Sequence, residues 1–396
     1  MDSAGRAHVL ITFGRSFLSL ELARLMAAGG HRVTTVDSVA VAISRFSNGG
    51  VSDFHRVPPP KFEPLAYCRA LARIVEENDV DMVIPVHEET DIIAMLADLF
   101  PPRCRLFLSD FDIENRLHHK YEFQELLVEL GTPTRKFARV AGPEDAGSLD
   151  FDKPFALKRL TRAVRRRCTR CSPGDPLTWL EHDEQNPWVA QEWISGDKYC
   201  TYSVCHEGRI YAHATYPVDY AIDGSSCLNF RSVDHPRIQA WVADIVERVD
   251  FTGQIGFDFI EDGPDKDLFC IECNPRATSG IMMFSPGDGV DRAFLGTSDP
   301  DTEIITPATD VDRMIGLGMM LYGWRAPSRN GRSLRQFIRD FRGGASDVIT
   351  RPGDQMPAVM LPFAYAGILR SCAKYRVGLA EGFMHDHEWD GLRISL

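Results

Sequence analysis

Residues 253–276 read GQIGFDFIEDGPDKDLFCIECNPR, and this stretch decides the fold of the chain. Apolar and polar residues alternate on both sides of a turn that a Gly-Pro pair favours, which predicts a β-hairpin. Residues i and i+2 of a strand share a face, so Glu272 and Asn274 present two oxygen ligands side by side. The midpoint of positions 258 and 272 falls in the turn, which places Asp258 opposite Glu272 on the partner strand.

Three oxygen donors, Asp258, Glu272 and Asn274, therefore converge as candidate metal ligands. Hard oxygen donors in small number suit Mg²⁺, which keeps its other coordination positions for water and substrate phosphates. Arg276 follows two residues after Asn274, where a guanidinium can stabilise charge on a transferring phosphoryl group. A bare pair of acids is more often solvated surface, but the Glu-X-Asn-Pro-Arg context favours a site.

Lysine is scarce in this chain, with eight Lys against 36 Arg, so each lysine is informative. Lys158 follows the apolar run FAL on a predicted strand, and Lys120 opens a predicted helix. Both are compact point charges of the kind that contacts phosphates. The next segment is rich in arginine and predicts either a basic loop that closes over a triphosphate or a solvated basic loop; its cations are Arg162, Arg165, Arg166, Arg167 and Arg170.

The ten cysteines are scattered along 396 residues, a pattern typical of reduced thiols. Cys168 with Cys171 and Cys270 with Cys273 form CxxC pairs that could hold zinc. Because positions three apart on a strand point to opposite faces, we expect the second pair to be small buried residues instead.

The pattern of hydrophobic runs changes twice along the chain. Residues 8–118 alternate short apolar runs with amphipathic stretches, which predicts a βαβ series with Gly14 in its first turn. No GxGxxG motif follows the first strand, so we do not expect a dinucleotide site. Closely spaced strands then indicate an α+β region with an antiparallel sheet. Beyond about residue 295 we expect helices over 311–322 and 333–341, and a buried helix over the apolar run 358–369.

The net charge of −12, from 44 Lys and Arg against 56 Asp and Glu, disfavours nucleic acid as a partner. No uninterrupted apolar run reaches the length of a membrane-spanning helix, and the N-terminus lacks the charged start of a signal peptide. We therefore expect a cytoplasmic protein, with membrane docking through residues 358–369 as the less favoured alternative.

Four segments in this order, FALKRL, QEWISGDKYCTYSV, TGQIGFDFIE and IECNPRATSGI, resemble the ATP-grasp superfamily over residues 8–295. The resemblance implies an α/β and α+β fold. A Rossmann-like N-terminal domain (1–118) would precede two lobes that hold ATP between them (119–295), followed by a helical C-terminal extension (296–396).

The resemblance also implies roles for single residues. Lys120 and Lys158 would contact phosphates, and Lys158 and Arg276 would act in catalysis. Lys198 stands where many members carry an acidic residue for the ribose, which leaves Asp197 or another residue for that task. The adenine would lie along Gln191, Glu192, Trp193 and Ile194, and magnesium would be held by Asp258, Glu272 and Asn274.

The implied function is an ATP- and Mg²⁺-dependent ligase that phosphorylates a carboxylate and joins it to an amine or amino acid, releasing ADP and phosphate. A narrower resemblance to mycosporine-glycine synthase-type enzymes is carried by SRFSNGGVSDFHRVPPP, VDMVIPV and HPRIQAWV. It implies instead that an amino acid condenses with an enolised cyclohexenone. A non-catalytic nucleotide-binding regulatory module is a third reading, and the resemblance allows a homodimer in each case.

Overall fold

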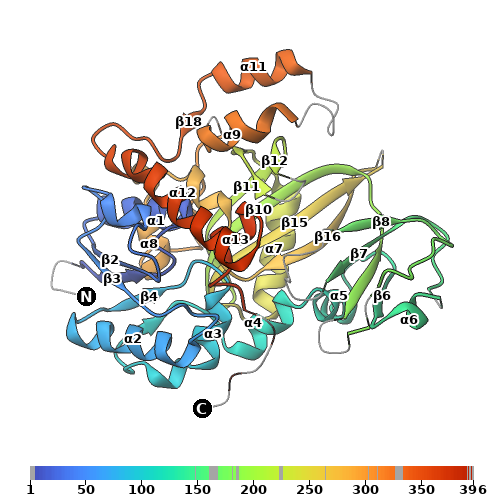
Figure 1. The fold of residues 1–396 in the computed structure, drawn as a ribbon, viewed down its shortest axis with the longest axis horizontal. Coiled ribbons are helices and arrows are strands. Elements are labelled where there is room, and N and C mark those ends of the chain that lie inside the picture. The colour runs from blue at the N-terminus through green and yellow to red at the C-terminus, as the bar shows by residue number, and fades with distance from the viewer. Residues whose placement is uncertain are drawn as a thin grey trace.

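The structure is a computed structural model, drawn as a ribbon in Figure 1. It describes residues 5–147, 149–159, 168–180, 182–183, 187–222, 226–263, 265–301, 303–309, 311–325, 333–389, 391 and 394.

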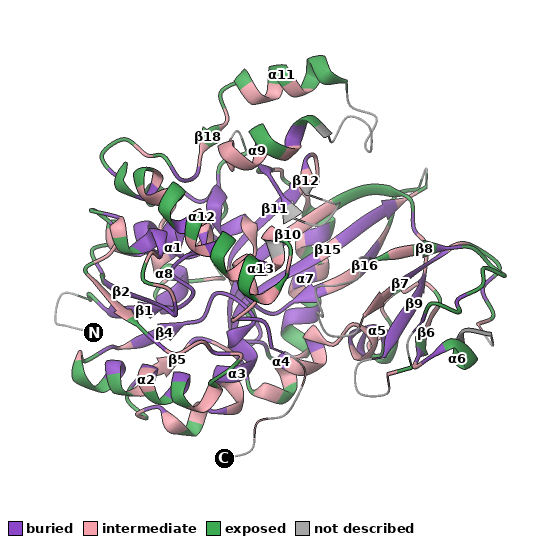
Figure 2. Cartoon of the chain, viewed as in Figure 1, coloured by how far each residue is buried: buried purple, intermediate pink, exposed green. Residues whose placement is uncertain are grey.

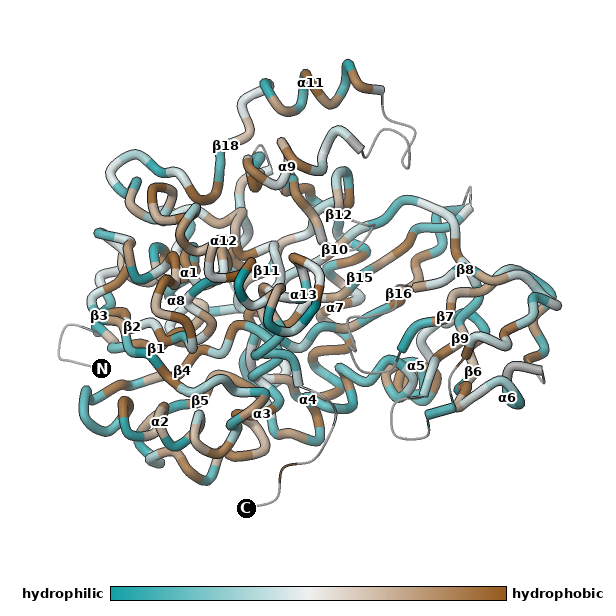
Figure 3. Tube along the Cα trace, in the orientation of Figure 1, coloured by the Kyte–Doolittle hydropathy of each residue, from teal (hydrophilic) through white to brown (hydrophobic). Residues whose placement is uncertain are grey.

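The N-terminal part is a five-stranded parallel sheet with the order β3-β2-β1-β4-β5. Side chains of β1 alternate between its two faces, so that Val9 and Ile11 pack under α1 while Leu10 packs under α2. Figure 3 shows the hydrophobic residues of this packing in brown along α1 and β4. This order is the Rossmann-like one expected from the sequence. The elements are β1 (His8–Ile11), α1 (Phe17–Ala28), β2 (Arg32–Asp37), β3 (Asp53–Arg56), α2 (Pro64–Glu77), β4 (Met82–Ile84), α3 (Glu89–Met95) and β5 (Arg105–Leu106).

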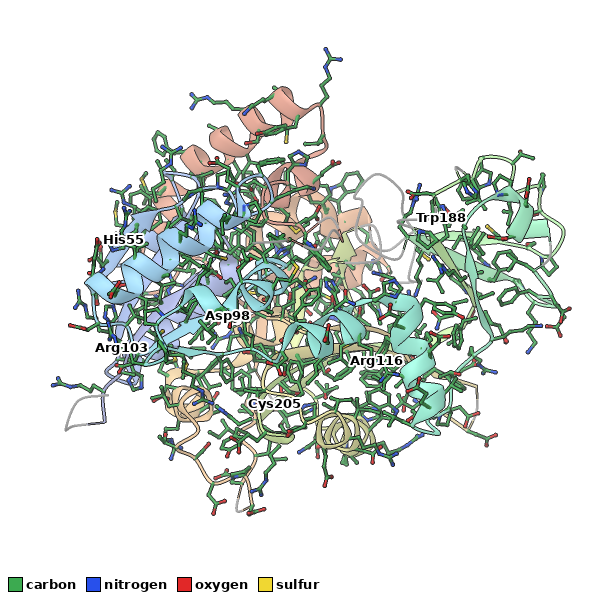
Figure 4. The ribbon with its side chains drawn as sticks, turned by 90° about the horizontal axis from the view of Figure 1, so that it is seen from below. His55, Asp98, Arg103, Arg116, Trp188 and Cys205 are labelled. Carbon is green, nitrogen blue, oxygen red and sulfur yellow. The ribbon has the colours of Figure 1, made fainter. Side chains whose placement is uncertain are left out.

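A small lobe follows, built on an antiparallel sheet with the order β6-β9-β7-β8. Trp188 is fully buried and packs against the apolar side chains of this sheet. Figure 4 shows Trp188 within this lobe, far from His55 in the parallel sheet. The elements are α4 (Phe111–His118), α5 (Lys120–Glu129), β6 (Phe137–Val140), α6 (Pro143–Gly147), β7 (Phe155–Arg159), β8 (Thr169–Cys171) and β9 (Trp188–Glu192).

The central sheet is antiparallel with the order β11-β10-β15-β16. One face packs against α5 and α7 through phenylalanine and isoleucine side chains. The other face, at β10 and β11, shares a core with α1 and the parallel sheet, which fixes the two sheets relative to each other. The elements are β10 (Gly196–His206), β11 (Arg209–Pro217), α7 (Pro236–Arg248), β15 (Gly253–Asp262), β16 (Asp267–Asn274), η3 (Ser279–Met283) and α8 (Val290–Leu295).

The C-terminal extension is less helical than the sequence predicts. The segment 311–322 begins as strand β17 (Asp312–Met314) and becomes helical only in α9 (Gly316–Tyr322). Strand β17 forms because it pairs with β14 (Asn229–Arg231), and this tertiary pairing overrides the local helical pattern. The third strand of that sheet is β18 (Ser346–Asp347), and the other helices are α11 (Leu334–Arg342), α12 (Met356–Tyr375) and α13 (Leu379–Met384).

The predicted buried helix over 358–369 is wrong in its burial. Helix α12 has 20 residues and, in the described part of the chain, is the one helix long and apolar enough to cross a membrane. Only 17% of its most apolar window is buried, because it contacts the protein along a narrow side that contains Pro357, Ala364 and Ile368. Figure 2 shows exposed residues along its length.

The buried His213 on β11 makes stability depend on pH. Its ring nitrogens lie 2.9 Å from Ser203 Oγ and 2.9 Å from Thr215 Oγ1, and burial lowers the pKa of His213 to about 4. An unfolded histidine titrates near pH 6.5, so the unfolded chain takes up a proton before the folded chain does as the pH falls. We expect the contribution of His213 to the free energy of unfolding to be present above pH 6.5 and to fall by about 3 kcal/mol by pH 4.

The check is urea unfolding followed by circular dichroism at pH 7.5 and pH 4.5 for the wild type and His213→Gln. The variant should lose less stability than the wild type between the two pH values. His55→Gln, at a partly exposed position, should behave as the wild type does. Equal losses for the wild type and His213→Gln would contradict the assignment.

Candidate active site

The hairpin of β15 and β16 places the predicted metal ligands as the sequence indicates. Asp258 and Glu272 are cross-strand partners in the antiparallel register. Phe257 and Phe259 belong to the apolar cluster under α5 and α7, so Asp258 between them lies on the opposite face of the sheet. Asn274 ends β16 and is buried.

A β-bulge adjusts the face on which Glu272 lies. The register passes from Asp258–Glu272 directly to Phe259–Cys270, which leaves Ile271 as the extra residue of β16. Ile271 packs with a small apolar cluster on the face opposite α5 and α7. Bulges of this kind re-aim side chains next to functional sites.

Cys270 and Cys273 are buried, as expected, but the bulge overturns the premise that they point to opposite faces. Cys270 and Cys273 lie in one apolar cluster, on one face of the sheet, because the extra residue breaks the simple alternation. Burial raises the pKa of both thiols well above the usual range, so they stay neutral. Among the described residues, no group of three or more His, Cys, Asp and Glu side chains is placed to hold a metal. The predicted ligand set differs from such a group because its third member is an amide.

The two predicted phosphate lysines come from different elements. Lys120 is the first residue of α5, and its Nζ lies 3.3 Å from Glu272 Oε1. Lys158 is on β7 and donates a hydrogen bond of 3.2 Å to Gln191 Oε1 on β9. Both contacts join positions that the sequence assigned to one site.

The pKa of the Cys168 thiol is raised, first by desolvation of the sulfur and then by Glu272, while Lys158, Lys198 and Lys120 act in the opposite direction. Of the predicted basic loop, Arg162, Arg165, Arg166 and Arg167 lie outside the described residues.

The predicted adenine segment ends β9 and leads toward β10. Glu192 carries an ion pair of 3.2 Å with Lys153, and the Trp193 ring lies 5.1 Å from the Arg170 guanidinium. Ile194 packs with Ile260, Phe269 and Ile271 of the hairpin, in the cluster that the bulge completes. Gln191, which holds Lys158, is itself buried.

The position expected for ribose contacts is basic and exposed. Lys198 is exposed on β10 and pairs in the strand register with Ile260. Its neighbour Asp197 forms an ion pair of 3.4 Å with Lys266 on the hairpin turn. Of the two, Asp197 is the one whose carboxylate could accept hydrogen bonds from sugar hydroxyls.

Arg276 connects the hairpin to the N-terminal sheet. Its Nη2 donates to Asn274 Oδ1 at 3.2 Å and lies 3.7 Å from Glu88 Oε1 at the end of the β4 loop. Arg276 and Glu88 are both buried. The site predicted from the hairpin therefore extends to the carboxyl edge of the parallel sheet.

The residues that the C-terminal segment brings to this edge were not predicted from the sequence. Arg15, in the turn after β1, donates 2.9–3.0 Å hydrogen bonds to Asp386 and forms a 2.5 Å ion pair with Asp37. Burial favours neutral Arg15, but the two carboxylates outweigh it and raise its pKa. The His387 ring is buried 4.3 Å from the ring of Phe13. The run HDHE at 385–388, dense in titratable residues, is the signal that could have found them.

No protein-family model matches the chain. Over 253 residues it is 21% identical to the "carbamoyl phosphate synthase large chain, C-terminal section" of Methanopyrus kandleri, an alignment that covers 60% of this chain and 46% of that protein. The chain thus spans about half the length of this curated relative.

Solved structures are similar over most of the chain. N5-carboxyaminoimidazole synthetase from Staphylococcus aureus, complexed with ADP, gives a TM-score of 0.61 at 15% identity over 80% of this chain and 83% of that one. The chain has the ATP-grasp fold. Biotin carboxylase from Campylobacter jejuni gives 0.59 at 15% identity, covering 74% and 71% of the two chains. L-amino acid ligase from Bacillus licheniformis gives 0.58 at 13% identity, covering 78% and 80%.

The C-terminal segment covers an edge of the parallel sheet, and the ion pair of Asp386 with Arg15 holds it there. A substitution at Asp386 tests this contact. Asp386→Asn removes a carboxylate from the buried Arg15 guanidinium, which leaves cationic charge less compensated. We expect hydrogen exchange at the amides of His387 and Glu388, which bond Met384 O, to rise at least about tenfold.

Mass-spectrometric hydrogen exchange on peptides from residues 380–391 gives the readout. Asp244→Asn is the matched control, because Asp244 forms an exposed ion pair with Arg248 on α7. Unchanged exchange in Asp386→Asn would show that this ion pair does not hold the segment.

Proposed function

We propose that the chain is an ATP- and Mg²⁺-dependent ligase that phosphorylates an oxygen of a carboxylate and joins the activated carbon to an amine or amino acid. ADP and phosphate are the other products. The observation that carries the proposal is the 3.3 Å contact between Lys120 and Glu272. It pairs the lysine to which we assign phosphate binding with the carboxylate to which we assign metal binding, and transfer of a phosphoryl group requires both.

The neighbours in structure support this reaction class. Those named above are a carboxyaminoimidazole synthetase solved with ADP, a biotin carboxylase solved in a β-γ-ATP complex and an L-amino acid ligase. The curated relative is a section of a carbamoyl phosphate synthase. Two of these structures contain an adenine nucleotide, which supports nucleotide binding at the site of this chain.

The side chains of the hairpin fit Mg²⁺. Asp258 and Glu272 are cross-strand partners, Asn274 adds an amide oxygen, and all three are oxygen donors. Glu272 pairs with one cation, the ammonium of Lys120 at 3.3 Å, which supports a site for positive charge. When bound, Mg²⁺ would neutralise charge on the phosphate oxygens of the nucleotide.

The chain's own residues have distinct tasks in the transfer. Lys120 and Lys158 bind phosphates and stabilise the charge that develops toward ADP. Arg276 stabilises the phosphoryl group as it passes to the acceptor oxygen, and Glu88 orients its guanidinium from 3.7 Å. Burial of this pair excludes water that would hydrolyse the activated acceptor.

A second candidate is the condensation of an amino acid with an enolised cyclohexenone, where the phosphorylated oxygen belongs to an enol. The segment 44–60, which carries the narrower resemblance, lies against the C-terminal extension. Ser47 Oγ donates to Asp354 at 2.6 Å, and the Lys61 amide just beyond the segment donates to the Asp386 carbonyl at 3.0 Å. The segment and the C-terminal extension therefore form one surface at the parallel sheet, whose residues could select a ring-shaped acceptor.

The test is liquid chromatography–mass spectrometry of the protein with ATP, Mg²⁺ and an amino-acid mixture, in wells with either carboxylates or cyclic β-diketones. We expect a condensation product with equimolar ADP. Product in the carboxylate wells supports the leading proposal, and product with the cyclic ketone alone supports the second candidate. ATP binding with no product in any well would favour the non-catalytic module.

Substitutions at the site should remove this activity. We expect Glu272→Ala and Lys158→Ala each to lower product formation by at least about a hundredfold, because metal and phosphate contacts stabilise the transition state. Lys136→Ala is the matched control, since Lys136 is an exposed lysine of the same lobe that pairs with Asp150. Product formation within a few-fold of wild type in either site variant would contradict the assignment.

A further inference from the structure

Helix α12 presents an apolar stripe to solvent. Val359, Phe363 and Leu369 are 57%, 61% and 58% exposed, which is unusual for side chains of this size. Residues spaced by three and four lie on one side of a helix, so these side chains form one continuous surface. We define the α12 stripe as Met356, Val359, Phe363, Ala366, Leu369 and Ala373.

The helix lies along the protein rather than away from it. Ala364 and Ile368 are buried on its opposite side, and Ala364 packs with Leu20 of α1 and Ile43. Pro362 lies inside the helix. These contacts hold α12 flat on the N-terminal part, with its stripe parallel to the surface of the molecule (Figure 2). A helix held in this way can enter the interface of a bilayer without spanning it.

The charged residues within helix α12 and its C-terminal end are of one sign. From residue 355 to residue 380 the sequence has no Asp or Glu, and the exposed cations Arg370, Lys374 and Arg376 follow at the C-terminal end of the stripe. The segment 316–376 has ten Lys and Arg against three Asp, in a chain whose net charge is −12. Three of these cations, Arg370, Lys374 and Arg376, lie at the C-terminal end of the exposed apolar surface.

We propose that the α12 stripe is a docking surface for an anionic lipid membrane. Apolar side chains would enter the headgroup boundary, while Arg370, Lys374 and Arg376 contact the lipid phosphates. Both features are needed, since an apolar stripe alone does not select anionic lipids. The structure thus favours the membrane reading that the sequence analysis ranked below a buried helix.

A second copy of this chain fits the stripe less well. A single 20-residue helix is about 30 Å long and about 10 Å wide. The area that its exposed side offers to a partner is therefore well below the roughly 800 Å² that each partner buries in a stable interface. Two copies that meet through their stripes would also bring the cations Arg370, Lys374 and Arg376 of one copy toward those of the other, which repel each other.

A hollow beside the stripe has the same chemistry. It has a volume of about 200 Å³ and lies between α12, α13 and the segment 39–43. Its walls are mainly apolar, with Phe363 of the stripe and Phe383 of α13, and Arg370 also lines it. An apolar space next to a cation suits part of a hydrocarbon chain below an anionic headgroup.

Co-sedimentation of the full chain with vesicles tests the proposal. We expect the wild type to pellet with phosphatidylglycerol–phosphatidylcholine vesicles at low salt, and at least about tenfold less with pure phosphatidylcholine or in 1 M salt. The double variant Phe363→Ser, Leu369→Ser should lose at least about tenfold of this binding. The triple variant with Arg370, Lys374 and Arg376 changed to Gln should lose its preference for anionic vesicles.

The matched control is Leu334→Ser, Ile338→Ser, which removes two exposed apolar side chains from α11 and should leave vesicle binding unchanged. Circular dichroism spectra identical to wild type show that each variant is folded. Absence of wild-type binding, or equal binding to neutral vesicles, would overturn the proposal. The proposal would also be overturned if the wild type formed a dimer in analytical ultracentrifugation, the double variant Phe363→Ser, Leu369→Ser were monomeric, and vesicle binding were absent.

Discussion

The candidate site depends on how β15 pairs with β16. The bulge at Ile271 turns Glu272 to the same face as Asp258 while Cys270 and Cys273 remain in the core under α5 and α7. From that position the hairpin contacts three other parts of the molecule. Glu272 pairs with Lys120 of α5, Ile271 packs on the segment after β9, and the residues after the hairpin reach the parallel sheet. A shift of one residue in this register would separate all three contacts.

The buried charges at the edge of the parallel sheet follow from the same arrangement. Taking a charge out of water costs several kcal/mol, so a buried ion pair is weak as a source of stability and strong as a constraint on geometry. Arg276 beside Glu88 fixes a guanidinium at the end of the hairpin. Arg15 with Asp37 and Asp386 fixes the C-terminal segment across the ends of the strands. Both sets orient groups around the region where we propose that an acceptor is phosphorylated.

Local patterns in the sequence predicted the βαβ series, the hairpin and the pairing of Asp258 with Glu272, because alternation and turn residues act over short distances. The bulge was not predicted, since one extra residue leaves no mark in composition, and the cysteine faces were wrong as a result. Strand β17 depends on a partner about 80 residues away, which no local pattern reveals. The exposure of α12 and the role of Asp386 depend on which surface each segment meets, a property of tertiary packing alone.

The central claim is that the lysines of the small lobe and the hairpin ligands bind one nucleotide with its metal. Isothermal titration of the full chain with ATP tests this most directly, in Mg²⁺ and in EDTA, for the wild type and Glu272→Gln. The account predicts one ATP per chain, bound at least about tenfold more tightly with Mg²⁺, and loss of most of that metal dependence in Glu272→Gln. ATP binding of equal affinity in Mg²⁺ and EDTA, or an unchanged metal dependence in the variant, would contradict it.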